Sequence, residues 1–256
     1  MAEEPTDNAR HYRGLLAQWY DEVLAGEGRD IDFYRGIVAA AGGPLLELAC
    51  GTGRLLVPYR EAGADVDGLD SSGDMLAVCR DKLQRRGLDA TLYEQRMEAI
   101  QLTRPYRLVF CSGGSFQLLD RLSAAEAALR GIHQALAPGG ELVLDLFMPW
   151  QQMRGGEDGV WRQGRTAVRA DGARFTAHHC DSFDFEHQVI RGTVRYEVHQ
   201  DGRLTESWLD AINLKWFGTD EFRMLLERAG FGGIRHESRS IISTHDDTVV
   251  YYATKE

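Results

Sequence analysis

The sequence predicts an α/β protein built around a mostly parallel sheet, and two observations support this prediction. Residues 44–49 form a short apolar run, typical of a strand that is buried on both faces. The run leads into Gly51 and Gly53, and a helical pattern begins at Arg54. Apolar runs and helical patterns then alternate as far as Phe147, as they do in chains whose strands pair in parallel.

The glycine turn after the first strand predicts a ligand site. Glycine permits positive φ and lets backbone amides approach a ligand without an intervening Cβ. The helix that follows directs its unpaired N–H groups at the turn. A dinucleotide site would need a third glycine, where this chain has Leu56. Instead an acidic residue precedes the turn, which gives the pattern Glu47-x-x-x-Gly51-x-Gly53. This pattern resembles motif I of the class I S-adenosylmethionine-dependent methyltransferases.

The resemblance implies a fold, a cofactor and several site residues. The fold would be Rossmann-like, with a sheet of seven mostly parallel strands and helices on both faces. The cofactor would be S-adenosyl-L-methionine, with its amino-acid part and ribose against the turn of Gly51, Gly53 and Arg54. Glu47 would orient the turn and contact the methionine amino group.

The end of the second predicted strand, residues 64–69, suits a ribose. Asp70 follows it, and a carboxylate can accept hydrogen bonds from two vicinal hydroxyls at once. Ser71 is a plausible N-cap of the next helix. The resemblance implies that Met75 packs on the adenine, although core filling is the common role of a methionine at helical spacing.

The end of the third predicted strand, residues 91–95, departs from the family pattern. Many relatives carry an aspartate there that accepts from the adenine amino group, whereas this chain has Arg96. Glu98 is the nearest acid. We therefore expect the backbone amide of Met97 and the carboxylate of Glu98 to meet the adenine.

The loop after the fourth predicted strand, residues 106–111, should face the transferred methyl group. Ligands of open α/β sheets bind outside the carboxyl ends of strands, near the point where the strand order reverses. We expect Ser112 beside the cofactor and Phe116 and Gln117 beside the acceptor. The Pro-Gly-Gly turn at 138–140, before a strand at 141–147, is a further landmark of the family.

The first 43 residues predict cap helices. Apolar side chains recur at helical spacing over residues 8–25 and again over 30–41. This segment resembles the N-terminal cap of small-molecule methyltransferases, in which an aromatic side chain closes over the cofactor. Tyr12 and Tyr20 are the candidates, while packing on the sheet is the alternative for Tyr20 and the favoured role of Trp19.

Residues 149–212 predict an inserted antiparallel sheet. Alternating segments are joined by Asp-Gly turns at 171–172 and 201–202, the chemistry of hairpins. The insertion divides the core into 44–148 and 213–256. It resembles the sheet that roofs the active site of sugar-amine and other natural-product N-methyltransferases. Neighbouring strand residues point to opposite faces, so one of His178 and His179 should bind the acceptor or take its proton. For the same reason no metal site is expected.

Charge and composition limit the partners. The net charge of −10 disfavours nucleic acid, whose binding relies on Lys and Arg. No apolar run is long enough for a membrane span, and the N-terminus lacks a signal-peptide pattern. The four cysteines are widely spaced, which indicates reduced thiols in a cytoplasmic protein.

These features predict transfer of a methyl group to an N or O of a small-molecule acceptor, and they leave a homodimer open. A sulfonium donor is already activated, so the protein mainly aligns the reactants and excludes water. An amine needs only its neutral form, whereas a hydroxyl needs a base. The alternatives are a protein that binds the cofactor without transferring a methyl group, as a sensor or inactive partner subunit, and a nicotinamide oxidoreductase, which Leu56 disfavours.

Overall fold

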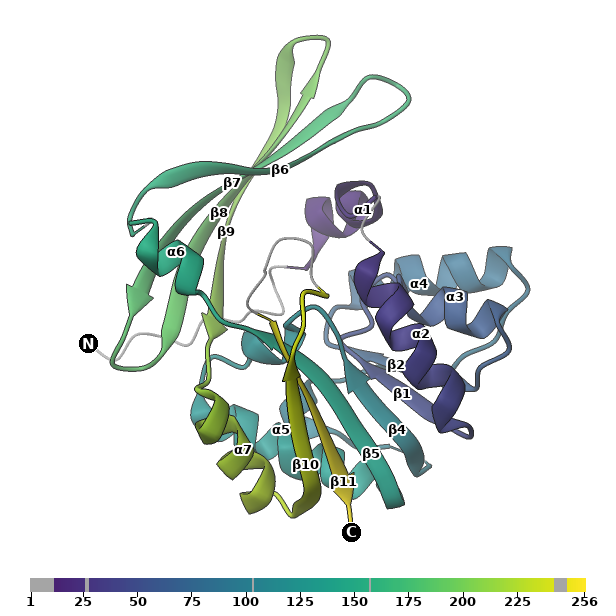
Figure 1. Ribbon diagram of the computed structural model, residues 1–256. Helices are drawn as coiled ribbons and strands as arrows, with labels where there is room; N and C mark the ends of the chain where they lie inside the picture. Colours follow the sequence, from purple (N-terminus) through teal and green to yellow (C-terminus); the bar gives the residue numbers. More distant parts are fainter. Residues whose placement is uncertain (1–11, 26–27, 103, 157, 242–247) are drawn as a thin grey trace.

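A seven-stranded sheet forms the centre of the computed structural model (Figure 1), which describes residues 12–25, 28–102, 104–156, 158–241 and 248–256. The strand order is β10-β11-β5-β4-β1-β2-β3, and only the pairings of β11 with β5 and β10 are antiparallel. The strands are β1 Leu45–Leu48, β2 Val66–Asp70, β3 Leu92–Glu94, β4 Tyr106–Cys111, β5 Leu136–Phe147, β10 Phe231–Ser238 and β11 Thr248–Lys255. The predicted fold class is confirmed.

Helices cover both faces of this sheet because its central strands are apolar on both sides. One face packs on α5 (Leu122–Ala135), α7 (Thr219–Arg228) and the short helix η2 (Met97–Ala99). The other packs on α2 (Arg29–Ala41), α3 (Leu56–Glu61) and α4 (Gly73–Arg85). Two further short helices are η3 (Ser115–Leu118) and α6 (Trp150–Arg154).

The central position of β1 brings three strand ends to one edge. Leu48 pairs with Leu69 of β2 on one side and with Cys111 of β4 on the other. The glycine turn, Asp70 and the loop that begins at Ser112 therefore leave the sheet side by side. This is the edge at which ligands of open α/β sheets bind.

A second sheet follows β5 in the chain. It consists of β6 (Trp161–Val168), β7 (Arg174–Asp184), β8 (Val189–Gln200) and β9 (Arg203–Lys215), which pair antiparallel in that order. Asp201 and Gly202 adopt positive φ at the β8–β9 turn. The sheet ends at Lys215, beyond the residue 212 expected from the sequence.

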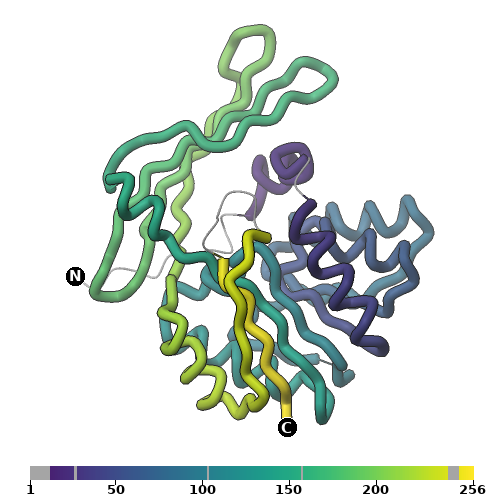
Figure 2. The backbone as a smooth tube through the Cα atoms, in the orientation of Figure 1, coloured from purple at the N-terminus to yellow at the C-terminus, as the bar shows by residue number. Residues whose placement is uncertain are grey.

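The helix α1 (Gly14–Val23) lies between the two sheets, as the ribbon and the Cα tube both show (Figures 1 and 2). Its apolar side chains pack with the inner face of the second sheet, through Leu15, Leu16 and Trp19. The predicted cap thus forms helices α1 and α2, while residues 1–11 and 26–27 of the cap lie outside the described residues.

One detail corrects the local prediction for α4. The hydroxyl of Ser72, not that of Ser71, accepts a hydrogen bond from the N–H of Met75 at 3.2 Å and caps the helix. The physical reason is register, because Ser72 has the extended backbone (φ −96°, ψ 109°) that an N-cap requires. Ser71 is thereby left to face a cavity.

Candidate active site

Two adjoining cavities lie at the carboxyl edge of the main sheet. The smaller one is bordered by the ends of β1 and β2, the segment after β3, and α1. The larger one, of about 620 Å³, lies between this edge and the inner face of the second sheet. Of the described residues, four line both cavities, namely Tyr12, Tyr20, Ser115 and Leu118. The two spaces therefore meet at one wall.

The two glycines of the turn serve different purposes. Gly51 has φ +54°, and a Cβ built there would meet no atom within 4 Å, so the space beside it belongs to the smaller cavity. Gly53 has φ +76°, and a Cβ there would lie 2.6 Å from Sγ of Cys79. Gly51 therefore opens room for a ligand, whereas Gly53 lets the turn pack on α4.

Asp70 holds the turn in place while still facing the smaller cavity. Its Oδ2 accepts from the N–H of Gly51 and its Oδ1 from the N–H of Ser72, each at 2.8 Å. Burial raises the pKa of Asp70, and the backbone N–H groups of Ser72, Gly51 and Ser71 counteract this effect. Each carboxylate oxygen has a second lone pair. The geometry therefore leaves two acceptor positions for a vicinal diol.

The other residues predicted around the adenosyl group gather here as well. Ser71, Met75, Met97 and Glu98 all line the smaller cavity. Met75 and Met97 are buried and supply apolar surface. The Nε of Arg96 donates to Oε1 of Glu98 at 2.6 Å, so the arginine that replaces the family's aspartate pairs with the nearest acid.

Glu47 and Arg54 lie farther from the smaller cavity than expected. Glu47 is buried, burial raises its pKa well above the usual range, and its Oε2 has no hydrogen-bond partner among the described residues. Arg54 forms a two-pronged ion pair with Asp30 of α2 and lines the larger cavity. Neither side chain is among those that line the smaller cavity.

These observations fit S-adenosylmethionine. The open space at Gly51 accommodates a ligand against the backbone, and the two Asp70 oxygens match a ribose diol. Met75 and Met97 suit the faces of an adenine ring. The carboxylate oxygen of Glu47 that lacks a partner among the described residues lies outside the lining of the smaller cavity, so the contact of Glu47 with the methionine amino group stays a prediction.

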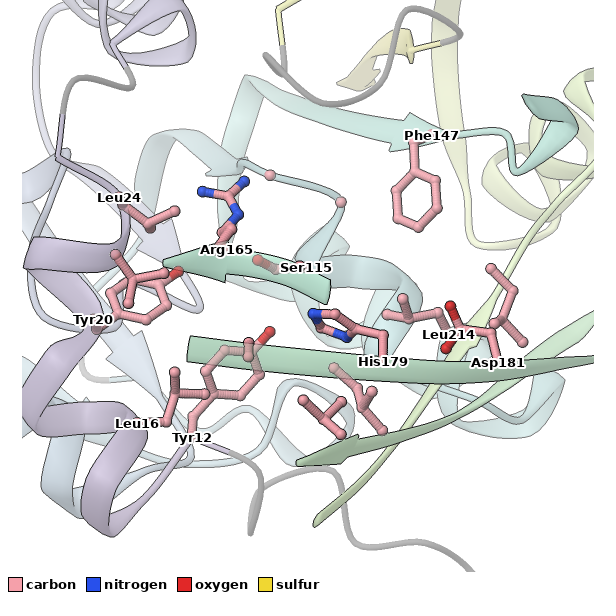
Figure 3. A pocket seen from close by; sticks show the side chains of 18 of the residues that line it. Tyr12, Leu16, Tyr20, Leu24, Ser115, Phe147, Arg165, His179, Asp181 and Leu214 are labelled. Carbon is pink, nitrogen blue, oxygen red and sulfur yellow. The ribbon is translucent and has the colours of Figure 1, made fainter. Parts of the chain in front are cut away.

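The second sheet forms the roof of the larger cavity through alternate residues of β7. Phe175, Ala177, His179, Asp181 and Phe183 all line it, as the two-residue period of a strand requires. Figure 3 shows the His179 ring within this wall, with Asp181 beyond it. His178 has the opposite direction, and its Nε2 lies 3.5 Å from Oε2 of Glu197. The structure thus directs His179 to the cavity, and its catalytic role stays a prediction.

The larger cavity also contains charged and phenolic groups. Arg162 and Arg165 of β6, together with Asp181, were not foreseen, although the parity of His179 on β7 would have indicated Asp181. Burial raises the pKa of both Tyr12 and Tyr20 at the shared wall. Their hydroxyls therefore remain protonated at neutral pH and can donate hydrogen bonds.

The structure corrects the expectation for three residues of the loop after β4. The carbonyl of Ser112 accepts from the N–H and hydroxyl of Ser115, and Ser112 lines neither cavity. Phe116 is fully buried against Phe222, with ring centroids 5.5 Å apart. The reason is that η3 turns Phe116 into the core, which leaves Ser115 at the cavity wall.

Gln117 is the third corrected residue. It is 1% exposed, and its amide group donates to the carbonyls of Phe147 and Lys215 at 3.0 Å each. Its Oε1 accepts from the N–H of Phe147 at 2.8 Å. Gln117 therefore joins the end of β5 to the end of β9. Both of its N–H donors are used, and its buried side chain lines neither cavity.

Asp145 of β5 holds the loop after β4 in place through hydrogen bonds. Its carboxylate accepts from the hydroxyl of Tyr34 at 2.6 Å and from the N–H groups of Gly113 and Gly114 at 3.2 and 2.8 Å. Both glycines line the larger cavity. Burial raises the pKa of Asp145 to about 6.

Asp145→Asn should therefore remove a pH-dependent part of the stability. Because the folded-state pKa exceeds the ordinary value near 4, this carboxyl group contributes stability below about pH 4 that is lost as the pH rises through about 6. The free energy of unfolding of the parent should fall by about 2–3 kcal/mol across this window relative to the variant. Urea denaturation of both proteins from pH 4 to 7 measures it, and parallel curves would contradict the assignment.

Comparison with known proteins places the chain in a family. A family model described as a methyltransferase domain matches residues 45–140. The chain is 33% identical over 146 residues to the dTDP-3-amino-3,6-dideoxy-alpha-D-glucopyranose N,N-dimethyltransferase of Streptomyces fradiae, which covers 54% of each chain. It is also 33% identical over 170 residues to the dTDP-3-amino-3,4,6-trideoxy-alpha-D-glucopyranose N,N-dimethyltransferase of Streptomyces venezuelae. This match covers 60% of this chain and 67% of that enzyme.

Solved structures share the whole architecture. DesVI from Streptomyces venezuelae superposes with a TM-score of 0.77 at 21% identity, over 96% of this chain and 100% of that one. An amino pentose methyltransferase from Micromonospora echinaspora, solved with its S-adenosylmethionine bound, gives 0.73 at 20% identity, over 96% and 98%. The chain belongs to the class I S-adenosylmethionine-dependent methyltransferases. S-adenosylmethionine is the cofactor of this class. The chain spans about half the length of the Streptomyces fradiae enzyme.

Two negative findings concern the described residues alone. Every helix there is too short or too polar to cross a membrane. No group of three or more His, Cys, Asp or Glu side chains in that part of the chain could hold a metal ion.

Proposed function

We propose that the chain methylates the amino group of a small-molecule acceptor, and that this acceptor is an amino sugar carried on a nucleoside diphosphate. The observation that carries the proposal is the pair of adjoining cavities with Tyr12, Tyr20 and Ser115 in their common wall. One cavity suits the methyl donor, and the other leaves about 620 Å³ for an acceptor. Direct transfer requires this adjacency, because nucleophile, methyl group and sulfur must lie in line.

The donor supplies a methyl group on a positively charged sulfur, so the acceptor nitrogen needs only a free lone pair. An amine at neutral pH is largely protonated and must first lose a proton. His179 is the group we assign to accept it, because its ring faces the larger cavity and imidazole exchanges protons near neutral pH. The protonated hydroxyls of Tyr12 and Tyr20 would orient the nitrogen at the shared wall, and α1 with the second sheet would exclude water.

The cations of the roof support an anionic acceptor. Arg162 and Arg165 line the larger cavity, and Arg29 lies at its border. Guanidinium groups bind phosphate oxygens through paired hydrogen bonds. Several relatives act on dTDP-linked amino sugars, which combine an amine with a diphosphate. In the larger cavity the amine of such an acceptor would meet His179, and its diphosphate would meet these arginines.

A matched panel of acceptors tests the proposal. Purified protein would be given S-adenosylmethionine with dTDP-linked sugars that carry either an amino or a hydroxyl group at the same carbon. We expect S-adenosylhomocysteine and an acceptor heavier by one or two methyl groups for the amines alone. Methylation of the hydroxyl partners would overturn the amine assignment. Binding of the cofactor with no methylated product from any acceptor would favour a protein that binds S-adenosylmethionine without transferring its methyl group.

We further propose a cytoplasmic homodimer. The four cysteines are free thiols, three of them buried, which suits a reducing compartment. The second sheet exposes large apolar side chains, including Val168, Trp208 and Leu209 at 62%, 54% and 66%, and such surface is typical of protein contacts. Sedimentation at micromolar concentration should give twice the chain mass of 28.7 kDa. A monomer would contradict the assembly and leave the proposed reaction intact.

A further inference from the structure

On the side of the second sheet, α1 packs through Leu15, Leu16 and Trp19, and the side chain of Arg169 adds polar contacts to this packing. Arg169, in the turn between β6 and β7, places its guanidinium carbon 3.8 Å from the centre of the Trp19 ring. Its Nε lies 2.7 Å from Oε1 of Glu22, and a terminal nitrogen donates to the carbonyl of Gln18 at 2.5 Å. One side chain thus contacts three residues on successive turns of α1.

The other side of α1 is held by residues around the smaller cavity. The N–H of Gly14 donates to Asp74 at 2.8 Å, and the hydroxyl of Ser72 donates to the carbonyl of Tyr12 at 2.5 Å. The hydroxyl of Thr52, inside the glycine turn, donates to Asp21 at 2.7 Å. A ligand that moves or orders this turn therefore acts on α1 directly.

An aromatic stack continues from Arg169 into the larger cavity. Trp19 stacks on Phe175 with ring centroids 5.6 Å apart, and Phe175 stacks on Tyr196 at 5.4 Å. Both Phe175 and Tyr196 line the larger cavity. The position of Trp19 beneath Arg169 therefore fixes part of the wall of the larger cavity. Tyr20 of the same helix, and Tyr12 just before it, border both cavities.

We propose that Arg169 is a positioning residue that couples the two cavities. By holding α1 against the β6–β7 turn, it transmits occupation of the smaller cavity to the wall of the larger one. A ten-residue helix moves largely as one body, so a change at its cofactor side reaches the β6–β7 turn through the contacts of Arg169 with Gln18, Trp19 and Glu22. Coupling of this kind is reciprocal, so an occupied acceptor cavity also favours the cofactor. The inference rests on the proposed function in one respect, namely that the smaller cavity takes S-adenosylmethionine.

Hydrogen exchange with S-adenosylhomocysteine as the probe tests this coupling without any turnover. In the parent, the probe should slow exchange in the glycine turn at 51–54, in α1, and in the β6–β7 turn at 168–174. None of the residues 168–174 lines either cavity. The slowing at 168–174 should be about fivefold or more, the lower end of typical coupling. In Arg169→Ala the slowing at 51–54 should remain and that at 168–174 should disappear.

Two further variants make the test specific. Arg195→Ala is the matched control, because Arg195 also contacts a tryptophan (Trp161, at 5.4 Å) and a glutamate (Glu197, at 3.0 Å) but makes neither contact with α1. It should behave like the parent. Glu22→Gln weakens the same contact from the helix side and leaves the second sheet unchanged, so it should reduce the slowing at 168–174 even if Arg169→Ala were to perturb the hairpin itself.

The outcomes separate the two proposals. Slowing at 168–174 that persists in both Arg169→Ala and Glu22→Gln would overturn the role of Arg169. The same holds if the parent shows slowing at 51–54 but none at 168–174. If the probe leaves 51–54 of the parent unchanged, the cofactor assignment behind the proposed function fails instead.

Discussion

Asp70→Ala should weaken the binding of S-adenosylhomocysteine by about one to two orders of magnitude. The carboxylate presents two acceptor positions to a ribose diol and also fixes the N–H of Gly51 at 2.8 Å. Leaving such hydrogen-bonding groups unpaired costs about 1–3 kcal/mol, and about 1.4 kcal/mol corresponds to a tenfold change in affinity. Isothermal titration calorimetry on the folded variant measures the effect directly.

Two further variants serve as the negative control and as the variant in which binding should be lost. Asp65→Ala is the control, because Asp65 precedes β2 at the opposite end from the cavity and pairs with Arg104 at the surface. Its affinity should equal that of the parent. Gly51→Val should abolish measurable binding, since its side chain would enter the open space beside the turn at a positive φ. Unchanged affinity in Asp70→Ala would remove the ribose assignment.

His179→Asn should lower turnover by about 10²-fold with cofactor saturating, the usual scale for loss of a general base. Asparagine keeps a polar side chain of similar reach but cannot accept the proton from an ammonium group. The variant should bind S-adenosylhomocysteine as tightly as the parent, because His179 lines the larger cavity and not the smaller one.

The adjacent histidine supplies the matched control for this prediction. His178 occupies the opposite face of β7 and lies near Glu197, so His178→Asn should retain the turnover of the parent. Full activity of His179→Asn would contradict a role for His179 as a base. Tyr12 and Tyr20 would then act on the amine by orienting it. Equal losses in both variants would indicate damage to the strand and would contradict a specific role for His179.

The main sheet could be predicted because few residue types can occupy the turns that connect its strands and helices. Positive φ at Gly51 and Gly53 is a requirement that few other residues meet, so the turn and its position before a helix follow from the sequence. The hairpin at Asp201 and Gly202 follows from the same chemistry. Asp70 was predicted as a ribose contact because a carboxylate directly after an apolar strand can accept from both hydroxyls of a vicinal diol.

The side-chain directions in the loop after β4 could not be predicted. Phe116 and Gln117 follow glycines in a sequence with no strand or helix period, so nothing in the pattern distinguishes the core side from the cavity side. The outcome depends on η3, and on two carbonyls, of Phe147 and Lys215, that come from distant parts of the chain. The same holds for Arg54, whose partner Asp30 lies on another helix.

The face of β7 that lines the larger cavity could not be predicted from the sequence either. The alternation along β7 predicts that His179 and Asp181 share a face, but it does not say which face meets the acceptor. The packing of Trp19 on Phe175 decides this, because it turns the odd-numbered residues toward α1 and the cavity. A one-residue change in register would have exposed His178 to the cavity instead.

A crystal structure with S-adenosylhomocysteine bound tests the central claim most directly. We expect the ribose hydroxyls on the carboxylate of Asp70 and the adenine between Met75 and Met97. The sulfur should lie at the wall shared by Tyr20 and Ser115 and face the larger cavity. A ligand whose ribose lies away from Asp70, or whose sulfur is separated from the larger cavity by protein, would contradict it.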